Sequence, residues 1–400
     1  MKVLFTTPTL EHPAAGGPQL RIENSLKALA KICDLSVVYR CRGALNLDHA
    51  AMEFFRSLCG DFVVNEFSGL SPNRYLRKLQ RVVGIDAIRD ADSLLRHVER
   101  TGATIVWFGF GNVSFPLIRR IQQRRPDLRL ICDTDSVWSR FVLRELPYAG
   151  AFRRQTIRLS GWRKVREERS WVELCDVTTA VSEIDAEYYR SIASRPEKIH
   201  MFANVIDTTS YQLSPAPPPG FKKPAVYLAG TFGHYHSPMD TAARWMIDQV
   251  LPIVRRSMPT LHFYIVGKNS EHRFGHLSDP GITVAGTLPS VLPYLCNANV
   301  SLVPLHFESG TRFKILEAGA CGVPIVSTRL GAEGLPVLDQ EHLLIADSPE
   351  DFAKAIMRIL NDPRLGAHLA LNCRHLVDSN FSIETLARQG QAILNRLEQP

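Results

Sequence analysis

Short apolar runs alternate with segments of helical periodicity along the whole chain. Apolar runs at 2–7, 35–39, 104–108 and 128–132 are each followed by a stretch that favours helix, and the second half repeats this alternation from 225 onwards. A short apolar run predicts a buried strand, and strands that alternate with helices form a parallel sheet covered on both faces. The sequence therefore predicts an α/β fold with two doubly wound domains.

A proline-rich stretch separates the two halves. Residues 214–220 read Ser-Pro-Ala-Pro-Pro-Pro-Gly, which favours a stiff, extended linker. We predict a first domain over 1–207, a linker over 208–222 and a second domain over 223–380. A C-terminal helix is expected over 381–400, and packing back on the first domain is one option for it.

The composition argues against a membrane-spanning, secreted or zinc-binding protein. No run approaches the roughly 20 apolar residues that a membrane-spanning helix needs, and the first residues read as a strand rather than a signal peptide. The eight cysteines form no C-x-x-C pair and no zinc spacing, so we expect reduced thiols. These features favour the cytoplasm.

Positive charge is concentrated in the first half. Residues 1–200 hold 31 Lys and Arg against 23 Asp and Glu, and the remainder hold 16 against 17. The excess fits a solvated basic surface, an anionic acceptor or contact with an acidic membrane face. We expect no nucleic-acid partner.

Residues 51–100 are predicted to be largely helical, with basic positions at Arg74, Arg77, Lys78 and Arg81.

The most basic segment, 151–169, has seven Lys and Arg interleaved with apolar residues such as Phe152 and Trp162. Such a helix can lie on an anionic membrane, or it can be an exposed helix docked on its own domain. Glu167 and Glu168 count against the membrane interpretation.

Three local sequence patterns are candidates for a binding or catalytic site. The stretch 300–328 predicts strand, turn, helix and strand, with Arg312, Lys314 and Glu317 just after a glycine turn; a helix N-terminus flanked by cations attracts an anion such as a nucleotide diphosphate. Gly16-Gly17 follows the first strand. Asp133-Thr-Asp135 follows the strand 128–132, where it could cap the next helix, face an acceptor or hold a metal.

The segments Gly310-Thr-Arg-Phe-Lys-Ile-Leu-Glu317-Ala and Gly322-Val-Pro-Ile-Val-Ser-Thr resemble the donor-binding core of GT-B glycosyltransferases of family 4. The likeness is greatest to bacterial sugar transferases with the G-T-R-x-K-x-x-E-A motif, of the exopolysaccharide and exosortase-associated type. Asn204-Val-Ile-Asp207 resembles another segment of that family. The resemblance implies two Rossmann-like domains facing a central cleft, a nucleotide-diphosphate sugar as co-substrate, no other cofactor, no metal, and retention of configuration.

The resemblance also assigns roles to single residues. Glu317 matches the second glutamate of the family's E-x7-E motif, which binds the donor ribose, while Ser309 stands where the first, sugar-contacting glutamate is expected. The backbone of Gly310 with Ser309, or Glu308 through a shifted loop, could replace that glutamate. The family's basic pair after the strand 225–229 is missing, and we hypothesise that Arg312 and Lys314 replace it as catalytic cations. The remaining predicted donor-binding residues are Gly310, Thr311, Gly230, Thr231, Gly267, Lys268 and Thr287. The predicted acceptor-side residues are Gly16, Gly17, Arg21 and Asp133.

The resemblance therefore implies a hexosyltransferase acting on a lipid-linked or polysaccharide acceptor, in the cytoplasm or at the inner face of the plasma membrane. Two other functions stay open. One is a non-catalytic subunit that retains a nucleotide site, and the less favoured one is a nucleotide-sugar epimerase.

Overall fold

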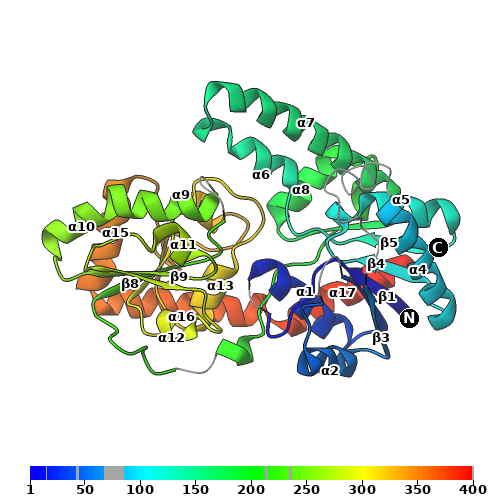
Figure 1. Ribbon diagram of the computed structural model, residues 1–400, viewed down its shortest axis with the longest axis horizontal. Coiled ribbons are helices and arrows are strands. Elements are labelled where there is room, and N and C mark those ends of the chain that lie inside the picture. The colour runs from blue at the N-terminus through cyan, green and yellow to red at the C-terminus, as the bar shows by residue number, and fades with distance from the viewer. Residues whose placement is uncertain (15, 42–44, 67–84, 212–214, 234–236, 399–400) are drawn as a thin grey trace. The chain divides into compact units, whose positions relative to one another are not determined.

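A computed structural model describes residues 1–14, 16–41, 45–66, 85–211, 215–233 and 237–398 (Figure 1). Internal contacts divide the chain into two units, Met1–Asn204 with Ile383–Pro400, and Val205–Ser382. The basic positions Arg74, Arg77, Lys78 and Arg81 and the linker residues 212–214 lie outside the described residues. Within the described part, no helix combines the length and the apolar character needed to cross a membrane.

In its described part, unit 1 is built on a seven-stranded parallel sheet with the order β3-β2-β1-β4-β5-β6-β7. Its strands are β1 (Lys2–Thr7), β2 (Asp34–Cys41), β3 (Asp61–Glu66), β4 (Ile105–Phe108), β5 (Arg129–Cys132), β6 (Val177–Ala180) and β7 (Ile199–Met201). Its helices are α1 (Gly17–Leu29), α2 (His49–Leu58), α4 (Ile85–Thr101), α5 (Phe115–Arg124), α6 (Trp138–Arg144), α7 (Ala151–Leu174), α8 (Glu183–Ile192) and α17 (Ile383–Glu398).

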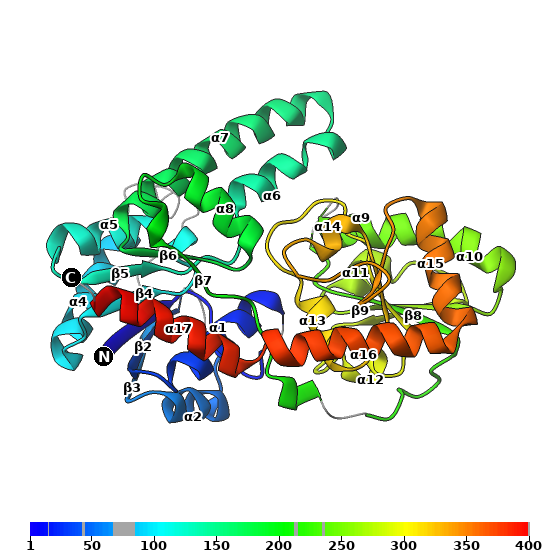
Figure 2. The same ribbon diagram turned by 180° about the vertical axis from the view of Figure 1, so that it is seen from behind.

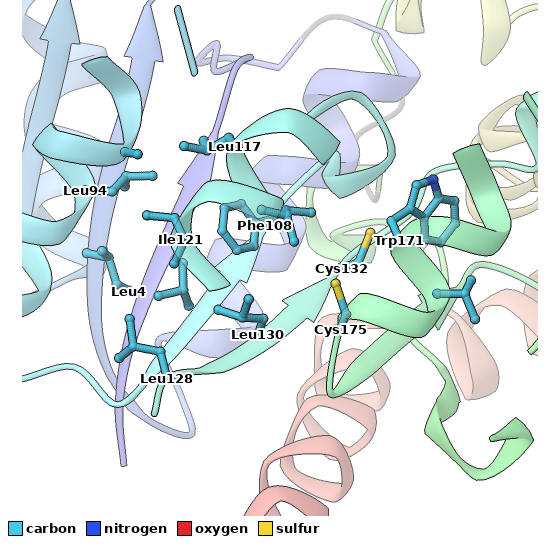
Figure 3. Packing of buried hydrophobic residues seen from close by; sticks show 14 of the residues in the cluster. Leu4, Leu94, Phe108, Leu117, Ile121, Leu128, Leu130, Cys132, Trp171 and Cys175 are labelled. Atoms are coloured by element: carbon cyan, nitrogen blue, oxygen red, sulfur yellow. The ribbon is translucent and has the colours of Figure 1, made fainter. Parts of the chain in front are cut away.

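The core of unit 1 lies between the sheet and the helices α4, α5 and α7. Leu4, Phe108 and Leu130 from the strands meet Leu94 and Ile121 from α4 and α5, all essentially inaccessible to solvent (Figure 3). On the opposite face α17 packs against α1, so closely that a Cβ added at Gly390 would lie 2.9 Å from the Ile32 side chain. The last helix is therefore packed within unit 1, against the first helix of the chain.

One strand of unit 1 was not predicted. Within the stretch 51–100, expected to be largely helical, the structure places α2, nearly all of α4 and, between them, the strand β3, which pairs with β2, with Phe62 opposite Val37. The strand carries the aromatic and β-branched residues Phe62, Val63 and Val64, which suit a pleated edge. Its polar ends, Asp61 and Glu66, hide this short run from a search for apolar segments.

Unit 2 has, in its described part, six parallel strands in the order β10-β9-β8-β11-β12-β13. They are β8 (Ala225–Ala229), β9 (His262–Val266), β10 (Ile282–Gly286), β11 (Val300–Val303), β12 (Ile325–Ser327) and β13 (Leu344–Ile345). The helices are α9 (Pro238–Trp245), which continues through a π-helical turn (Met246–Val250) into α10 (Leu251–Ser257), α11 (Ser270–Phe274), α12 (Leu292–Leu295), α13 (Phe313–Ala320), α14 (Arg329–Ala332), α15 (Pro349–Asn361) and α16 (Pro363–Asn380). α9 and α10 cover one face of the sheet, and α12 and α16 the other (Figures 1 and 2).

The predicted pair of doubly wound α/β domains is confirmed. In each sheet the strand order reverses beside the first strand of the unit, at β1 and β4 in unit 1 and at β8 and β11 in unit 2. The loops that leave the carboxyl ends of two such strands diverge and open a crevice, which is where open α/β sheets bind ligands. In unit 2 those loops begin at Gly230 and at Pro304.

Candidate nucleotide site and the buried cluster of unit 1

The loops after β8, β9 and β10 are joined to one another through their backbones. Gly230 N–H donates to Val266 O at 3.0 Å, Phe232 N–H to Lys268 O at 2.8 Å, and Gly267 N–H to Gly286 O at 2.9 Å. Gly267 has φ 120°, and a Cβ there would lie 2.2 Å from Gly230 O, so no other residue fits. The predicted donor-binding residues of these loops therefore form one connected rim at the switch point.

Three of the predicted donor-binding residues on this rim are exposed, namely Thr231, Lys268 and Thr287. The Thr287 hydroxyl donates to Glu271 Oε1 at 3.1 Å and accepts from the Asn269 amide at 3.3 Å. Lys268 presents a cation at the rim. Their contacts with a donor stay predictions.

The opposite side of the switch point is the loop from β11 into α13. Gly310 has φ 80°, a left-handed conformation that favours glycine and turns the chain sharply into the helix. The N-cap position of α13, Arg312, makes no side-chain cap hydrogen bond. The first amides of α13 are therefore left without a side-chain acceptor from the cap residue, the arrangement that suits an anion.

Arg312 turns back onto this loop. Its side chain is buried, and its guanidinium donates to Ser309 O at 2.9 Å and to Gly310 O. In this position Arg312 holds the glycine turn together from within. The sequence predicted a cation directed at pyrophosphate, and that role stays a prediction.

Lys314 and Glu317 follow on the first two turns of α13, and both are half-buried. Burial lowers the pKa of Lys314, opposed by the nearby carboxylates of Glu308 and Glu317. Burial raises the pKa of Glu317, opposed by Lys314 and by a hydrogen bond from Tyr211. Both groups are thus poorly hydrated charges, as in a site that exchanges water for a ligand.

Tyr211 is a member of this site that sequence reasoning missed. It ends a 3-10 turn, Thr208–Tyr211, and its hydroxyl donates to Glu317 Oε1 at 3.1 Å. The hydrogen bond holds the carboxylate in place and leaves Oε2 for another donor. The one sequence signal was position, since Tyr211 comes shortly after the family-like segment ending at Asp207.

Ser309 and Glu308 occupy the place of the missing glutamate. The Ser309 side chain is 9% exposed, and its hydroxyl has no hydrogen-bond partner within the described parts of the chain. The Glu308 carboxylate bends back to accept from the Ser309 amide at 3.3 Å. The structure therefore brings both candidate replacements to the start of α13.

Arg21 and Asp133, predicted on the acceptor side, form a buried ion pair in unit 1. Arg21 is 2% exposed and Asp133 is inaccessible. Arg21 also donates to Asn204 Oδ1 at 2.7 Å, and Thr179 Oγ1 donates to Asp133 Oδ1 at 2.6 Å. This cluster joins α1 to the carboxyl ends of β5 and β6 and gives Arg21 the partner that the sequence alone did not reveal. Gly16, with φ 109°, is the N-cap residue of α1, which begins at Gly17.

The predicted capping role of the Asp133-Thr-Asp135 motif is wrong. The N-cap of α6 is Val137, which makes no side-chain cap hydrogen bond. Asp135 instead accepts from Asn112 Nδ2 at 2.6 Å and Trp138 Nε1 at 3.2 Å, and burial raises its pKa. The Asp135 carboxylate is thus held by the side chains of Asn112, in the loop after β4, and of Trp138, the first residue of α6. Among the described residues, no three His, Cys, Asp or Glu side chains gather closely enough to hold a metal ion.

Parts of the chain are similar in sequence to known proteins. Residues 226–362 match the family of glycosyl transferases group 1. A D-inositol 3-phosphate glycosyltransferase from Acidothermus cellulolyticus is 43% identical over 74 residues, a match that spans 18% of this chain and only 16% of that relative.

Solved structures match over nearly the whole chain. Sucrose-phosphate synthase from Thermosynechococcus elongatus is 18% identical with a TM-score of 0.72, covering 99% of both chains. Anabaena HepE in complex with UDP-glucose is 14% identical with a TM-score of 0.66, covering 100% of both chains. The chain therefore has the fold of GT-B glycosyltransferases, and its residues 226–362 are similar to the glycosyl transferases group 1 family.

Proposed function

We propose that the protein is a retaining, metal-independent glycosyltransferase that moves a hexose-type sugar from a nucleotide-diphosphate sugar to a glycan or lipid-linked acceptor. The observation that carries the proposal is the half-buried Glu317, held by Tyr211 beside Lys314 at the start of α13. A carboxylate accepts hydrogen bonds only, so its free oxygen suits the paired hydroxyls of a ribose.

The chemistry of sugar transfer asks for positive charge at the leaving pyrophosphate. Negative charge develops there as the glycosidic bond breaks, and preorganised donors stabilise it without reorganisation. Lys314 and the first amides of α13 supply such donors. Arg312 contributes by holding the Gly310 turn, which keeps those amides directed at one place. The donor phosphate itself assists the acceptor hydroxyl, so no protein base is assigned.

The proposed acceptor is a lipid-linked or polysaccharide intermediate of exopolysaccharide type, used in the cytoplasm or at the inner face of the plasma membrane. Its support is the excess of Lys and Arg in the first half of the chain. The UDP-glucose bound by HepE makes uridine nucleotides the first donors to test.

The test begins with a thermal-shift screen of UDP, GDP, ADP and their sugars. A ligand at 100 times its Kd stabilises by about 2.7 kcal/mol, so the correct base gives a clear shift. The donor found in this way is then incubated with candidate acceptors in the presence of EDTA, and the product's anomeric configuration is read by NMR. No shift with any nucleotide, an inverted product, or activity lost to EDTA and restored by a metal would each contradict part of the proposal.

A non-catalytic nucleotide-binding subunit is the second candidate, and Ser309 favours it. A serine hydroxyl replaces a carboxylate at the position that contacts the transferred sugar in the family. Donor turnover separates the two functions, because a subunit gives a thermal shift with nucleotide but releases none from any donor.

A further inference from the structure

The helices α6 and α7 form a hairpin on unit 1, joined through the turn Leu146–Tyr148 (Figures 1 and 2). One stripe of α7 is buried, formed by Ile157, Gly161, Glu168, Trp171 and Val172. The packing is tightest at Gly161, where an added Cβ would lie 2.4 Å from the Leu143 side chain of α6. The orientation of α7 about its own axis is therefore set by the side that faces α6.

The opposite side of α7 carries large apolar residues in the open. Phe152 is 97% exposed, Leu159 51% and Trp162 56%. With 3.6 residues per turn these three lie within about 80° of one another and roughly opposite the buried stripe. They extend over about 15 Å of the helix. Three exposed side chains of this size in one row are a patch rather than scattered surface residues.

Arginines flank this row. Arg158, Arg163, Arg166 and Arg169 lie on the same half of α7, and the Arg166 guanidinium stacks over Trp162 at 4.8 Å from the ring centroid. Within the described part of the chain, none of the four forms an ion pair. The outer side of α7, defined by Phe152, Leu159 and Trp162 with these arginines, is therefore both apolar and cationic.

The acidic residues of the hairpin do not neutralise this side. Glu145 pairs with Arg153, and Glu167 pairs with Lys164 at 2.7 Å. Glu168 is buried and accepts from the Ser139 amide at 2.8 Å. Glu167 and Glu168, which counted against a membrane interpretation in the sequence, are thus engaged within the hairpin.

We propose that the outer side of α7 binds the anionic headgroups of a phospholipid bilayer. Trp and Phe rings settle at the boundary between headgroups and acyl chains, and long arginine stems let the charge remain among the phosphates. The charge complementarity selects an acidic membrane over a purely apolar partner. The proposal goes beyond sugar transfer, because membrane binding requires neither nucleotide nor acceptor.

The test uses the full chain without nucleotide, and vesicles of phosphatidylcholine alone or mixed with phosphatidylglycerol. Co-sedimentation and tryptophan emission report binding. We expect binding to the acidic vesicles, weakened by salt, with a blue shift of the emission. Each basic residue near an anionic surface contributes about fivefold, so Arg163→Glu with Arg166→Glu is expected to weaken binding at least about twentyfold.

Two matched controls separate this surface from the rest of the molecule. The pair Arg56→Glu and Arg119→Glu reverses two exposed charges on other helices of unit 1 and is expected to weaken binding much less than the α7 pair. Leu371→Ser removes a side chain that is 53% exposed on α16, and it is compared with the triple variant Phe152→Ser, Leu159→Ser and Trp162→Ser. Unchanged melting temperatures verify that the variants fold.

Three results would overturn the proposal. They are equal binding to both kinds of vesicle, no effect of the α7 variants beyond that of the controls, and absence of binding at low salt. Light scattering measures the oligomeric state and distinguishes a membrane-binding surface from an interface between copies of the chain. If the triple variant converts a dimer into a monomer while vesicle binding is unaltered, the outer side of α7 is an interface between copies of this chain.

Discussion

Replacing Glu317 by Gln should weaken nucleotide binding and remove its dependence on pH. Glutamine is nearly isosteric, but its carbonyl oxygen lacks the charge that strengthens hydrogen bonds from the ribose. A hydrogen bond to a charged group contributes about 1.5–3 kcal/mol, so losing the charge should cost ~2 kcal/mol, or about thirtyfold in Kd.

The pH dependence follows from the environment of Glu317. Burial raises the pKa of this carboxyl above its usual value of 4.5. Binding of ribose hydroxyls favours the ionised form, so affinity is constant above the raised pKa and falls as the pH drops through it. Tyr211→Phe removes a hydrogen bond that stabilises the ionised form and should move this fall to higher pH.

The measurement is Kd by calorimetry across the acidic range. The ligand is the nucleotide sugar that gives the strongest thermal shift, since its pyrophosphate has no group that titrates near neutrality. An E317Q variant that binds as tightly as the wild type would refute the ribose assignment. A pH profile that persists unchanged in E317Q would show that another group titrates.

Four further predictions address the other groups. Arg21→Met leaves the Asp133 carboxylate buried without its cation and should lower the free energy of unfolding of unit 1 by about 3–5 kcal/mol, measured by urea denaturation; adding Asp133→Asn should recover part of the loss. Gly267→Ala should destabilise unit 2 by at least ~2 kcal/mol, because φ 120° and a 2.2 Å approach to a carbonyl oxygen exclude a Cβ; an unaltered unfolding curve would contradict the geometry. Lys314 must be protonated to stabilise pyrophosphate, and burial lowers its pKa below 10.5, so kcat/KM should fall on the alkaline side and Lys314→Arg should move that fall to higher pH. Ser309→Ala should alter the ratio of kcat/KM between donor sugars while leaving nucleotide Kd within about twofold, and a proportional loss for all sugars would remove Ser309 from sugar recognition.

Local sequence signals define the regular elements well where capping residues and helical periodicity agree. A serine followed by proline and, two positions further on, by aspartate is typical of a helix start, and α15, Pro349–Asn361, begins at such a sequence, with the Ser348 hydroxyl accepting from the Asp351 amide. Ser182 caps α8 in the same way, since its hydroxyl accepts from the Asp185 amide. β3 escaped prediction because its ends are polar.

Contacts between distant residues were beyond local reasoning. Arg21 finds Asp133 112 positions away and Asn204 183 positions away, and Tyr211 reaches Glu317 across 106 positions. No spacing rule connects such residues, because the sheet topology alone brings them together. The resemblance to a family pointed to Glu317 through its motif, but it carried no information on Tyr211.

Under the proposed function, we expect the loop before α13 to recognise the donor sugar. A glutamate at position 309 would accept two hydrogen bonds, whereas the Ser309 hydroxyl donates one and accepts others, so it suits a single sugar hydroxyl or ring oxygen. To reach the sugar, Glu308 would have to release at least the Ser309 amide, and the loss of that hydrogen bond alone costs ~1 kcal/mol. Arg312 opposes that movement, because its guanidinium holds the carbonyls of Ser309 and Gly310 in the present turn. From the contacts within the loop we therefore predict that Ser309, rather than Glu308, is the group that meets the transferred sugar.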